Sequence, residues 1–453
     1  MIMRWFALPQ GARFSNKELL AFIFPIIFET LLVACLGMAD TLMVSSLGET
    51  FVAGVALVNR IDNFAKQFLV AMAQGGCVIL AQYIGAENQE KAQISMKEVV
   101  RIITGIALIG FLFLAISKRP LLQFLYGNAE PEVLAVSMEY FTVTVLSYPF
   151  CSLYYCCTNA YRVMGESRIP FLSSVLMMSV NLLLKYLFIF HCDMGVFGAA
   201  LSTLIAMALS GLTLSLMLMR KSNKIRLVGL CSPVFDWGIG KKILKVSIPN
   251  GLEQGMFQLG ALAIAGLVAS LGTASIAADQ IARNISPFIY SCGSGFAGVM
   301  LMAVGQCMGA RDIEGAKLYT RHILKLDYLF TFVNAILLFL VLKPVIGLFQ
   351  VSKEAQSYAY DIMVLYILFS TLFYPTSFAV PSSLRGAGDT GFVMWVSTAS
   401  MFLFRIAAAY FFVHILHMGV LGTWVAMILD WVIRSAVFYV RFLHGKWQGH
   451  NII

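Results

Sequence analysis

AQYIGAENQEKA, residues 81–92, returns with changes as GQCMGARDIEGA at residues 305–316. Four positions of this stretch are identical 224 residues later: Gln82 and Gln306, Gly85 and Gly309, Ala86 and Ala310, and Ala92 and Ala316. RVMGES at 162–167 resembles RGAGDT at 385–390, and GVFG at 195–198 resembles GVLG at 419–422. Because three matches follow one another at nearly one offset, the sequence predicts two related halves.

The composition around these motifs is that of a membrane protein. Of the 453 residues, 59% are hydrophobic and 12% charged, with a mean hydropathy of +0.82, whereas soluble domains carry about 25% charged residues. About twelve apolar segments are long enough to cross a bilayer as helices, and they lack the alternation of barrel strands. They lie near 19–45, 52–81, 99–117, 133–157, 169–190, 196–219, 246–270, 275–304, 322–342, 358–379, 392–413 and 420–443. The sequence predicts an all-α integral membrane protein with twelve transmembrane helices.

The longest polar connection, residues 221–245, separates six apolar segments from six. We expect an N-lobe at 1–220, a cytoplasmic linker at 221–245 and a C-lobe at 246–453. Because six is even, both halves enter and leave on the same side, so the repeat is parallel. Parallel repeats are one of the two arrangements of secondary transporters, which hold substrate near the interface of the halves. The pattern favours a transporter with two lobes around a central cleft.

Basic residues predict the orientation in the membrane. If the N-terminus is inside, the outside segments hold only Lys118, Arg119, Lys343 and Lys353 among the basic residues that flank the spans. Cytoplasmic segments of membrane proteins carry more Lys and Arg than the segments outside. We therefore expect the chain to lie in the cell (inner) membrane with both termini in the cytoplasm. This bias explains the net charge of +9 without a nucleic-acid partner. Residues 1–14 show no cleavable signal, so we expect the first span to be retained.

Motifs of other protein classes are absent from the sequence. There is no GxxxxGK[ST] phosphate loop, and there is no HExxH, GxSxG or catalytic Cys and His arrangement. The nine cysteines form no CxxC pair and are interpreted as small apolar side chains rather than redox or metal ligands. We expect no enzyme activity and no cofactor. We therefore expect an ion gradient, of H⁺ or Na⁺, to drive transport. Na⁺ is the only metal ion that we consider as a possible ligand.

Several motifs together resemble the multidrug and toxic compound extrusion (MATE) family, in its NorM/DinF-like members. They are MADTLMVSSLGE (38–49), ALVNRI (56–61), AQYIGAEN (81–88), YRVMGESRIPF (161–171), SIPNGLEQ (247–254) and LRGAGDT (384–390). The resemblance covers almost the whole chain. It implies a two-lobed exporter with twelve helices that exchanges drug-like, often cationic substrates for H⁺ or Na⁺. Sister families of the same superfamily flip lipid-linked sugars.

An ionisable residue inside the membrane costs roughly 2.5–3.5 kcal/mol on insertion scales and suggests a functional site. Asp40 matches the first-helix aspartate that binds a proton or sodium ion in many family members; a carboxylate held by a structural partner is the alternative. The fifth span carries Lys185 where such members carry a second aspartate, and Asn181 lies on the same helix face. Asp40 and Lys185 each lie about five residues, roughly 7–8 Å, before the outer end of their span.

We therefore expect Asp40 and Lys185 to form an ion pair. An ammonium group beside Asp40 would repel Na⁺, while a proton or cationic substrate could act by breaking the pair. A purely structural bridge, or a lysine that reaches outward to the interface, stays open.

Glu253 resembles the seventh-helix glutamate of the NorM-like branch. Gly251 and Gly255 flank it with the small-xxx-small spacing that lets helices approach closely. Pro249 could free backbone carbonyls for a ligand. The tenth-helix aspartate of that branch has no counterpart, because the chain has no carboxylate between Asp361 and Asp389. A buried, hydrogen-bonded glutamate without a transport role is the alternative.

Three acid–base pairs stand four residues apart, acid first, which is the favoured orientation on a helix. They are Asp62 and Lys66, Asp279 and Arg283, and Asp430 and Arg434. The first two lie in the second span of each half and could line the cleft; mutual neutralisation is the alternative. Tyr154 and Tyr155 could hold flat organic cations by cation–π contact, although helix packing is the more frequent role of such residues.

Two similar motifs follow the fourth and tenth spans. Gly165 and Gly388 suit tight turns, and the charged residues Arg162 and Arg385 beside them are interpreted as fixing turn geometry and orientation rather than touching substrate.

Together these features predict an ion-coupled antiporter that exports amphipathic, often cationic organic compounds by rocker-switch alternating access. The expected partners are small organic molecules and membrane lipid, with the protein a monomer. A flippase of lipid-linked saccharide, or an exporter of a specific metabolite, is the alternative. An integral membrane enzyme ranks last, since the six His are scattered along the chain.

Overall fold

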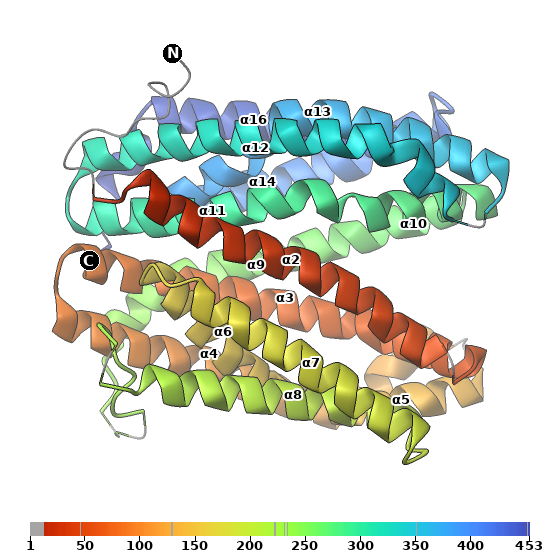
Figure 1. The fold of residues 1–453 in the computed structure, drawn as a ribbon, viewed down its shortest axis with the longest axis horizontal. Helices are drawn as coiled ribbons and strands as arrows, with labels where there is room; N and C mark the ends of the chain where they lie inside the picture. The colour runs from red at the N-terminus through yellow and green to blue at the C-terminus, as the bar shows by residue number, and fades with distance from the viewer. Residues whose placement is uncertain are drawn as a thin grey trace. The chain divides into compact units, whose positions relative to one another are not determined.

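The computed structural model describes residues 13–45, 47–127, 130–221, 223–230, 232, 234–349, 351–450 and 452–453. In the first helix, the side chains of residues 34, 36, 38–42, 44 and 45 lie outside the description. No strand occurs in the described ranges, which are helical apart from short connections (Figure 1).

The described part of the first half of the chain contains seven helices. They are α2 (Asn16–Ser45), α3 (Glu49–Gly85), α4 (Gln89–Tyr126), α5 (Pro131–Leu146), α6 (Tyr148–Val163), α7 (Arg168–Phe190) and α8 (Gly195–Leu218). The second half follows the same plan with more breaks. Its helices are α9 (Trp237–Ala269), α10 (Thr273–Ile285), α11 (Pro287–Gly309), α12 (Ile313–Gly347), α13 (Lys353–Ala387), α14 (Thr390–Ser400), the π-helix η1 (Met401–Ala407), α15 (Ala408–His414), α16 (Gly419–Leu443) and the 3-10 turn η2 (Lys446–Gly449).

The predicted all-helical membrane class is confirmed. Among the described residues, ten helices are long and apolar enough to cross a membrane. The pair α5 and α6, bent by 45°, is long and apolar enough only when taken together, and it brings the number to eleven if the pair is one broken span. The 30-residue helix α2, which covers the first predicted segment, is not one of these. Each of the twelve apolar segments therefore falls on a helix or on a broken series of helices.

The internal repeat is visible in the backbone. Glu87 and Arg311 both take a positive φ, of +57° and +59°, in the turns before α4 and α12. The next residues, Asn88 and Asp312, both cap their helix by accepting a hydrogen bond from the backbone N–H three residues later, the usual role of these residue types. Other pairs of positive-φ residues 224 positions apart are Gly48 and Gly272, Asp193 and His417, and Gly195 and Gly419. Equivalent turn chemistry thus connects the helices of both halves.

The chain packs into two compact units. Leu32–Gly251 forms one, here called the N-terminal unit, and Met1–Leu31 together with Leu252–Ile453 forms the other, the C-terminal unit. The boundaries fall inside α2 and α9, so each of these helices contributes to both units. The lobe boundaries that the sequence predicts at 220 and 246 stay a prediction.

In the N-terminal unit, the first part of α9 packs closely on α3. A Cβ atom at Gly75 of α3 would lie 2.8 Å from the Cα atom of Ser247 and 3.0 Å from the carbonyl oxygen of Val246. Only glycine allows two helix backbones to approach so closely, as small residues do at helix interfaces in membranes. Gly211 of α8 meets the carbonyl oxygen of Phe150 in the same way.

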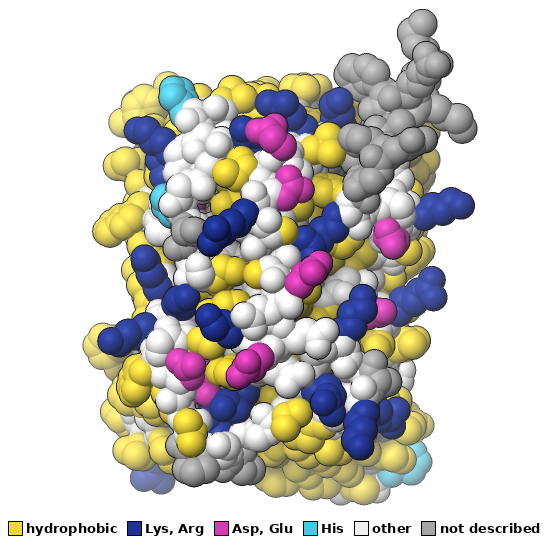
Figure 2. Space-filling model, turned by 90° about the vertical axis from the view of Figure 1, so that its left-hand side faces the viewer, with side chains coloured by type: hydrophobic (Ala, Val, Ile, Leu, Met, Phe, Trp, Pro, Cys, Tyr) yellow, Lys and Arg dark blue, Asp and Glu magenta, His cyan; other side chains and the backbone are white. Residues whose placement is uncertain are grey.

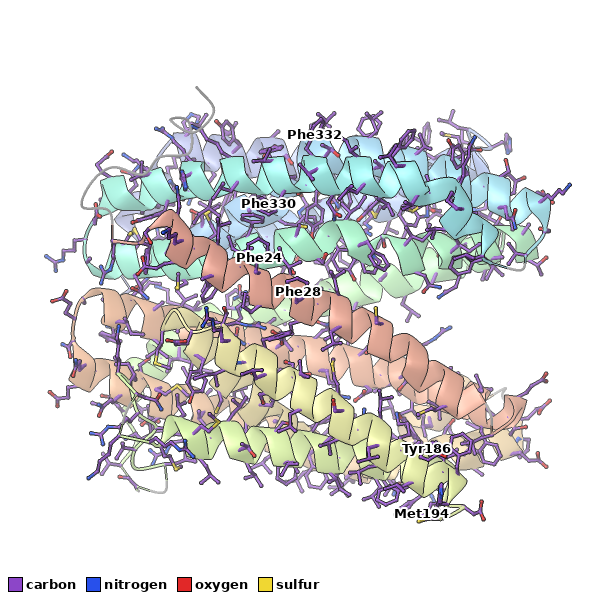
Figure 3. The ribbon with its side chains drawn as sticks, viewed as in Figure 1. Phe24, Phe28, Tyr186, Met194, Phe330 and Phe332 are labelled. Atoms are coloured by element: carbon purple, nitrogen blue, oxygen red, sulfur yellow. The ribbon has the colours of Figure 1, made fainter. Side chains whose placement is uncertain are left out.

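In the C-terminal unit, the first part of α2 packs on α11 and α12. Ile23 is fully buried in the same hydrophobic cluster as Phe296 of α11. The ring of Phe24 lies edge-on to Phe330 of α12, with 6.0 Å between ring centroids (Figure 3). Phe28, further along α2, is exposed (Figure 3). The apolar face of α2 before Leu32 therefore belongs to the core of this unit.

Charged side chains gather at helix ends. Figure 2 shows the face at the left-hand side of Figure 1, where α11 passes into α12, with Lys and Arg side chains spread across it. Arg311, Lys317 and Arg321 belong to this turn and the first turns of α12. The placement of that turn on the cytoplasmic side stays a prediction.

Candidate functional site

The N-terminal unit contains a buried ion pair on α3. The Nζ atom of Lys66 lies 2.7 Å from Oδ2 of Asp62, whose exposed fraction is 6%. The two residues stand one helical turn apart, which places them on one face, as the sequence predicts. Tyr148 and Tyr155 of α6 lie within electrostatic range of this pair. Since the side chains are only 17% exposed for Lys66 and 8% for Asp62, each charge of the pair depends on the other.

The aromatic candidates of α6 are packed against their neighbours. The rings of Tyr154 and Tyr155 meet edge-on, with 5.6 Å between centroids. The Tyr154 hydroxyl forms a 2.6 Å hydrogen bond with Oγ of Ser174 on α7. Tyr154 is 5% exposed, so in this conformation it joins α6 to α7. Contact of either ring with an organic cation stays a prediction.

On α7, the two polar candidates point into the protein. Lys185 is 1% exposed, which argues against a lysine that reaches outward to the interface. Asn181 accepts a 3.4 Å hydrogen bond from Oγ1 of Thr203 on α8. The Asp40 side chain lies outside the described residues. The ion pair of Asp40 with Lys185 therefore stays a prediction.

In the C-terminal unit, Glu253 has a cationic partner that the sequence analysis assigned elsewhere. Nη2 of Arg385, near the end of α13, donates a 2.7 Å hydrogen bond to Oε1 of Glu253 on α9. The side chains are 5% exposed for Glu253 and 18% for Arg385. The interpretation of Arg385 as a residue of turn geometry was wrong, since its guanidinium group connects two helices. The following turn is held by Gly388, with φ of +99°, and by Asp389, which accepts a hydrogen bond from Arg441.

The pair on α10 is joined to α16. Nε of Arg283 donates a 2.6 Å hydrogen bond to Oδ2 of Asp279. The other carboxylate oxygen accepts a 3.0 Å hydrogen bond from Nε1 of Trp424. Asp279 is buried, whereas the Arg283 side chain is 42% exposed. This carboxylate is thus satisfied by a guanidinium group and an indole from two different helices.

A third buried group forms around Asp430 of α16. This fully buried carboxylate lies 3.8 Å from guanidinium nitrogens of both Arg434 and Arg405. Oγ of Ser400 donates a 2.5 Å hydrogen bond to it. Arg405 lies on the π-helix η1, a distortion that is often found at functional sites. The sequence predicts the pair of Asp430 with Arg434, whereas Arg405 reaches it only through the fold.

Arg434 is 2% exposed, and two of its nitrogens, Nε and Nη1, have no hydrogen-bond partner. The rings of Phe257 and Phe378 lie over its guanidinium group, each with its centroid 5.0 Å away. Such cation–π contacts compensate in part for lost water. One carboxylate therefore serves two guanidinium groups in this part of the unit, Arg434 with a 2% exposed side chain and Arg405 with one that is 19% exposed.

The structure also contains a buried carboxyl group that the sequence analysis did not consider. Asp327 lies in α12 and is fully buried. The signal was present, since an aspartate stands inside the apolar segment 322–342 with isoleucine four residues before it and threonine four after it. Asp327 differs from the paired acids because no basic residue stands four positions before or after it.

The candidates are thus distributed over both units as separate pairs. No group of three or more His, Cys, Asp or Glu side chains with the geometry of a metal site occurs in the described part of the chain. The eight described cysteines form no disulfide with one another.

The MatE family model matches residues 25–187 and 249–411 of this chain, one copy in each half. A Thermotoga maritima protein named "Probable multidrug resistance protein NorM" is 26% identical over 444 residues, covering 97% of this chain and 94% of its own. The Bacillus subtilis protein "Uncharacterized transporter YisQ" is also 26% identical, with 95% and 94% covered.

Solved structures share the fold. A crystal structure of MATE in the bent conformation has a TM-score of 0.87 at 19% identity, with 96% of each chain covered. A transporter of the MOP superfamily from Pyrococcus furiosus, for which a reversed polarity of the binding pocket is described, has a TM-score of 0.85 at 21% identity, with 95% of this chain and 96% of its own covered. The two family matches on one all-helical chain are decisive: the protein belongs to the MatE family, the multidrug and toxic compound extrusion transporters, and it is a multi-pass membrane transporter and not an enzyme.

Proposed function

We propose that this protein is an antiporter that exports amphipathic, often cationic organic compounds in exchange for H⁺ or Na⁺. The observation that carries the proposal is the set of buried ion pairs inside membrane-spanning helices of a MatE-family chain. Glu253 with Arg385 and Asp62 with Lys66 are each held at 2.7 Å. Buried charges in a membrane are costly and mark ion or substrate pathways.

Such pairs supply the differential binding that antiport requires. A cation or proton that binds one carboxylate weakens its bond to the basic partner, and this changes the relative free energies of the conformations that the pair stabilises. An organic cation that competes for the same carboxylate is then released when the coupling ion binds. The proposed orientation, with both termini in the cytoplasm, follows from the basic residues at the helix ends.

The relatives support an organic substrate. The Thermotoga maritima and Neisseria meningitidis proteins are both named for multidrug resistance, and crystal structures of MATE include complexes. We propose small organic molecules as the substrates of this chain, membrane lipid as its surroundings and a monomer as its working form. The coupling residues that we propose are Asp40, Lys185 and Glu253.

The proposal is tested with purified protein in liposomes and a fluorescent organic cation. A pH gradient alone and a sodium gradient alone are imposed on wild type and Asp40→Asn, with Asp361→Asn of an exposed carboxylate as the matched control. Transport driven by pH and lost in Asp40→Asn supports a proton site at Asp40. Transport driven by sodium and unchanged in Asp40→Asn moves the coupling site to Glu253. Absence of cation transport under either gradient contradicts the proposal and favours a flippase.

A further inference from the structure

Asp327 occupies an unusual position for a carboxyl group. It lies 14 residues after Ile313, the first residue of α12, and therefore about 21 Å along the helix. Its side chain has no exposed surface. Helix α12 is long and apolar enough to cross a membrane, and Asp327 lies five residues inside the apolar segment 322–342 that the sequence predicts as the span.

Asp327 has little to stabilise a negative charge. Oδ1 accepts a 3.2 Å hydrogen bond from Oγ1 of Thr331, while Oδ2 has no hydrogen-bond partner. Within the described residues, no Lys, Arg or His forms an ion pair with it. The buried acids Glu253 and Asp62, by contrast, each have a basic partner at 2.7 Å. A buried carboxyl group without a cation is stable only when it carries a proton.

On α12 itself, His322 and Lys325 precede Asp327 by five and two residues, and no ion pair joins either of them to it among the described residues. The groups that its charge affects are weak acids. Cys292 of α11, Tyr374 of α13 and Tyr328 of α12 lie within its electrostatic range. The first part of α2, which also packs on α12, brings the buried carboxyl group of Glu29 to this unit. These groups are neutral or acidic, so none of them supplies the positive charge that an ionised Asp327 would need.

A link to the buried arginines runs through α13. Tyr374 lies within electrostatic range of both Asp327 and Arg434. Its ring stacks on Phe378 at 4.3 Å, and Phe378 lies against the Arg434 guanidinium group. Arg405 and Arg434 share one carboxylate, Asp430. This cluster has a net charge of +1. Within the described residues Asp327 forms no ion pair with either arginine, so an ionised Asp327 changes only the total charge of the unit's interior, and its protonation leaves the excess positive charge in place.

We propose that Asp327 is a proton-binding site of the C-terminal unit and that its protonation makes the interior of this unit repel organic cations. A proton from water forms an O–H bond at Oδ2 and no other bond breaks; the reverse step returns the proton to water. The inference rests on the proposed function, because it names the carboxyl group through which H⁺ opposes a cationic substrate. Asp327 is then a further acid of this unit that changes protonation, in addition to the coupling residues proposed above.

The test uses full-length protein in liposomes and two readouts. Infrared difference spectra recorded across a pH titration detect carboxyl groups that gain a proton. We expect a carboxylic-acid band that is present in wild type and in the control Asp361→Asn, and absent in Asp327→Asn. Binding of tetraphenylphosphonium is measured at mildly acidic and mildly alkaline pH. Wild type should bind it more weakly at acidic pH, by about tenfold, within the usual range of coupling between two sites.

The two variants of Asp327 should differ in how their affinity for tetraphenylphosphonium depends on pH. Asp327→Asn imitates the protonated acid, so its affinity should be weak at both pH values, while Asp327→Glu should restore the pH dependence and show that the fold is intact. A wild-type pH dependence in Asp327→Asn, or a titrating band that persists in it, overturns the proposal. If wild type fails to bind tetraphenylphosphonium, the proposed function is contradicted, whereas the infrared band still decides whether Asp327 takes up a proton.

Discussion

The ion pair of Glu253 with Arg385 makes a quantitative prediction about stability. At 2.7 Å and an effective dielectric constant of about 20, the attraction between the two charges is about 6 kcal/mol before desolvation is subtracted. The Glu253 side chain is 5% exposed and that of Arg385 is 18% exposed. Loss of Arg385 leaves a buried carboxylate that water cannot reach, whereas loss of Glu253 leaves a guanidinium group that is closer to solvent.

The two single variants should therefore differ. We expect Arg385→Gln to lower the free energy of unfolding by about 3 kcal/mol, the lower end of the range for breaking a buried pair, and Glu253→Gln to lower it by roughly 1–2 kcal/mol. The double variant should cost less than the sum of the two, with a coupling energy of about 2 kcal/mol. The assay is unfolding in mixed micelles with increasing denaturing detergent, followed by tryptophan fluorescence.

An exposed pair provides the control. Lys317 and Glu314 are also close, at 2.8 Å, but the Glu314 side chain is 84% exposed. Because solvent screens such an exposed pair, Lys317→Gln should leave the free energy of unfolding unchanged within the error of the assay. Additive single-variant effects, or an Arg385→Gln cost as small as that of Lys317→Gln, would refute the reasoning that burial makes the pair strong.

Three further predictions concern packing and hydrogen bonds in the C-terminal unit. Gly386→Ala places a Cβ atom 2.9 Å from a backbone carbonyl oxygen of α11 and should lower the free energy of unfolding by about 1–3 kcal/mol through overpacking. Gly266→Ala is the control, because no described atom lies within 4 Å of its Cβ position. In the same assay it should leave the free energy of unfolding unchanged or raise it by up to about 1 kcal/mol. Trp424→Phe removes the 3.0 Å hydrogen bond to the Asp279 carboxylate and should cost about 1.5–3 kcal/mol, with unchanged stability contradicting the role of the indole. Trp447→Ala removes a fully buried, stacked ring, so limited proteolysis of the C-terminal segment should become faster than in wild type.

Some features of the site follow from local sequence. Asp62 with Lys66, and Asp279 with Arg283, are one helical turn apart, and a helix places such residues on one face whatever surrounds it. The turns of the two halves also depend on residues that are adjacent in sequence, because Asn88 and Asp312 cap the helices that directly follow them.

Other features depend on which helix faces meet. Arg385 reaches Glu253 across 132 positions, and Trp424 reaches Asp279 across 145. No spacing in the sequence encodes these contacts, because they depend on how α9, α10, α13 and α16 are rotated and packed.

The sequence by itself determined the membrane class, the apolar segments, the two related halves and the pairs within single helices. Their physical basis is short-range: hydrophobic length decides insertion, and the helical period decides which neighbours meet. Only the tertiary structure decided that α2 and α9 are each divided between two units and that Asp430 serves two arginines. It also decided that Asp327 is buried with no basic partner among the described residues, since the lack of a partner depends on every helix packed around it.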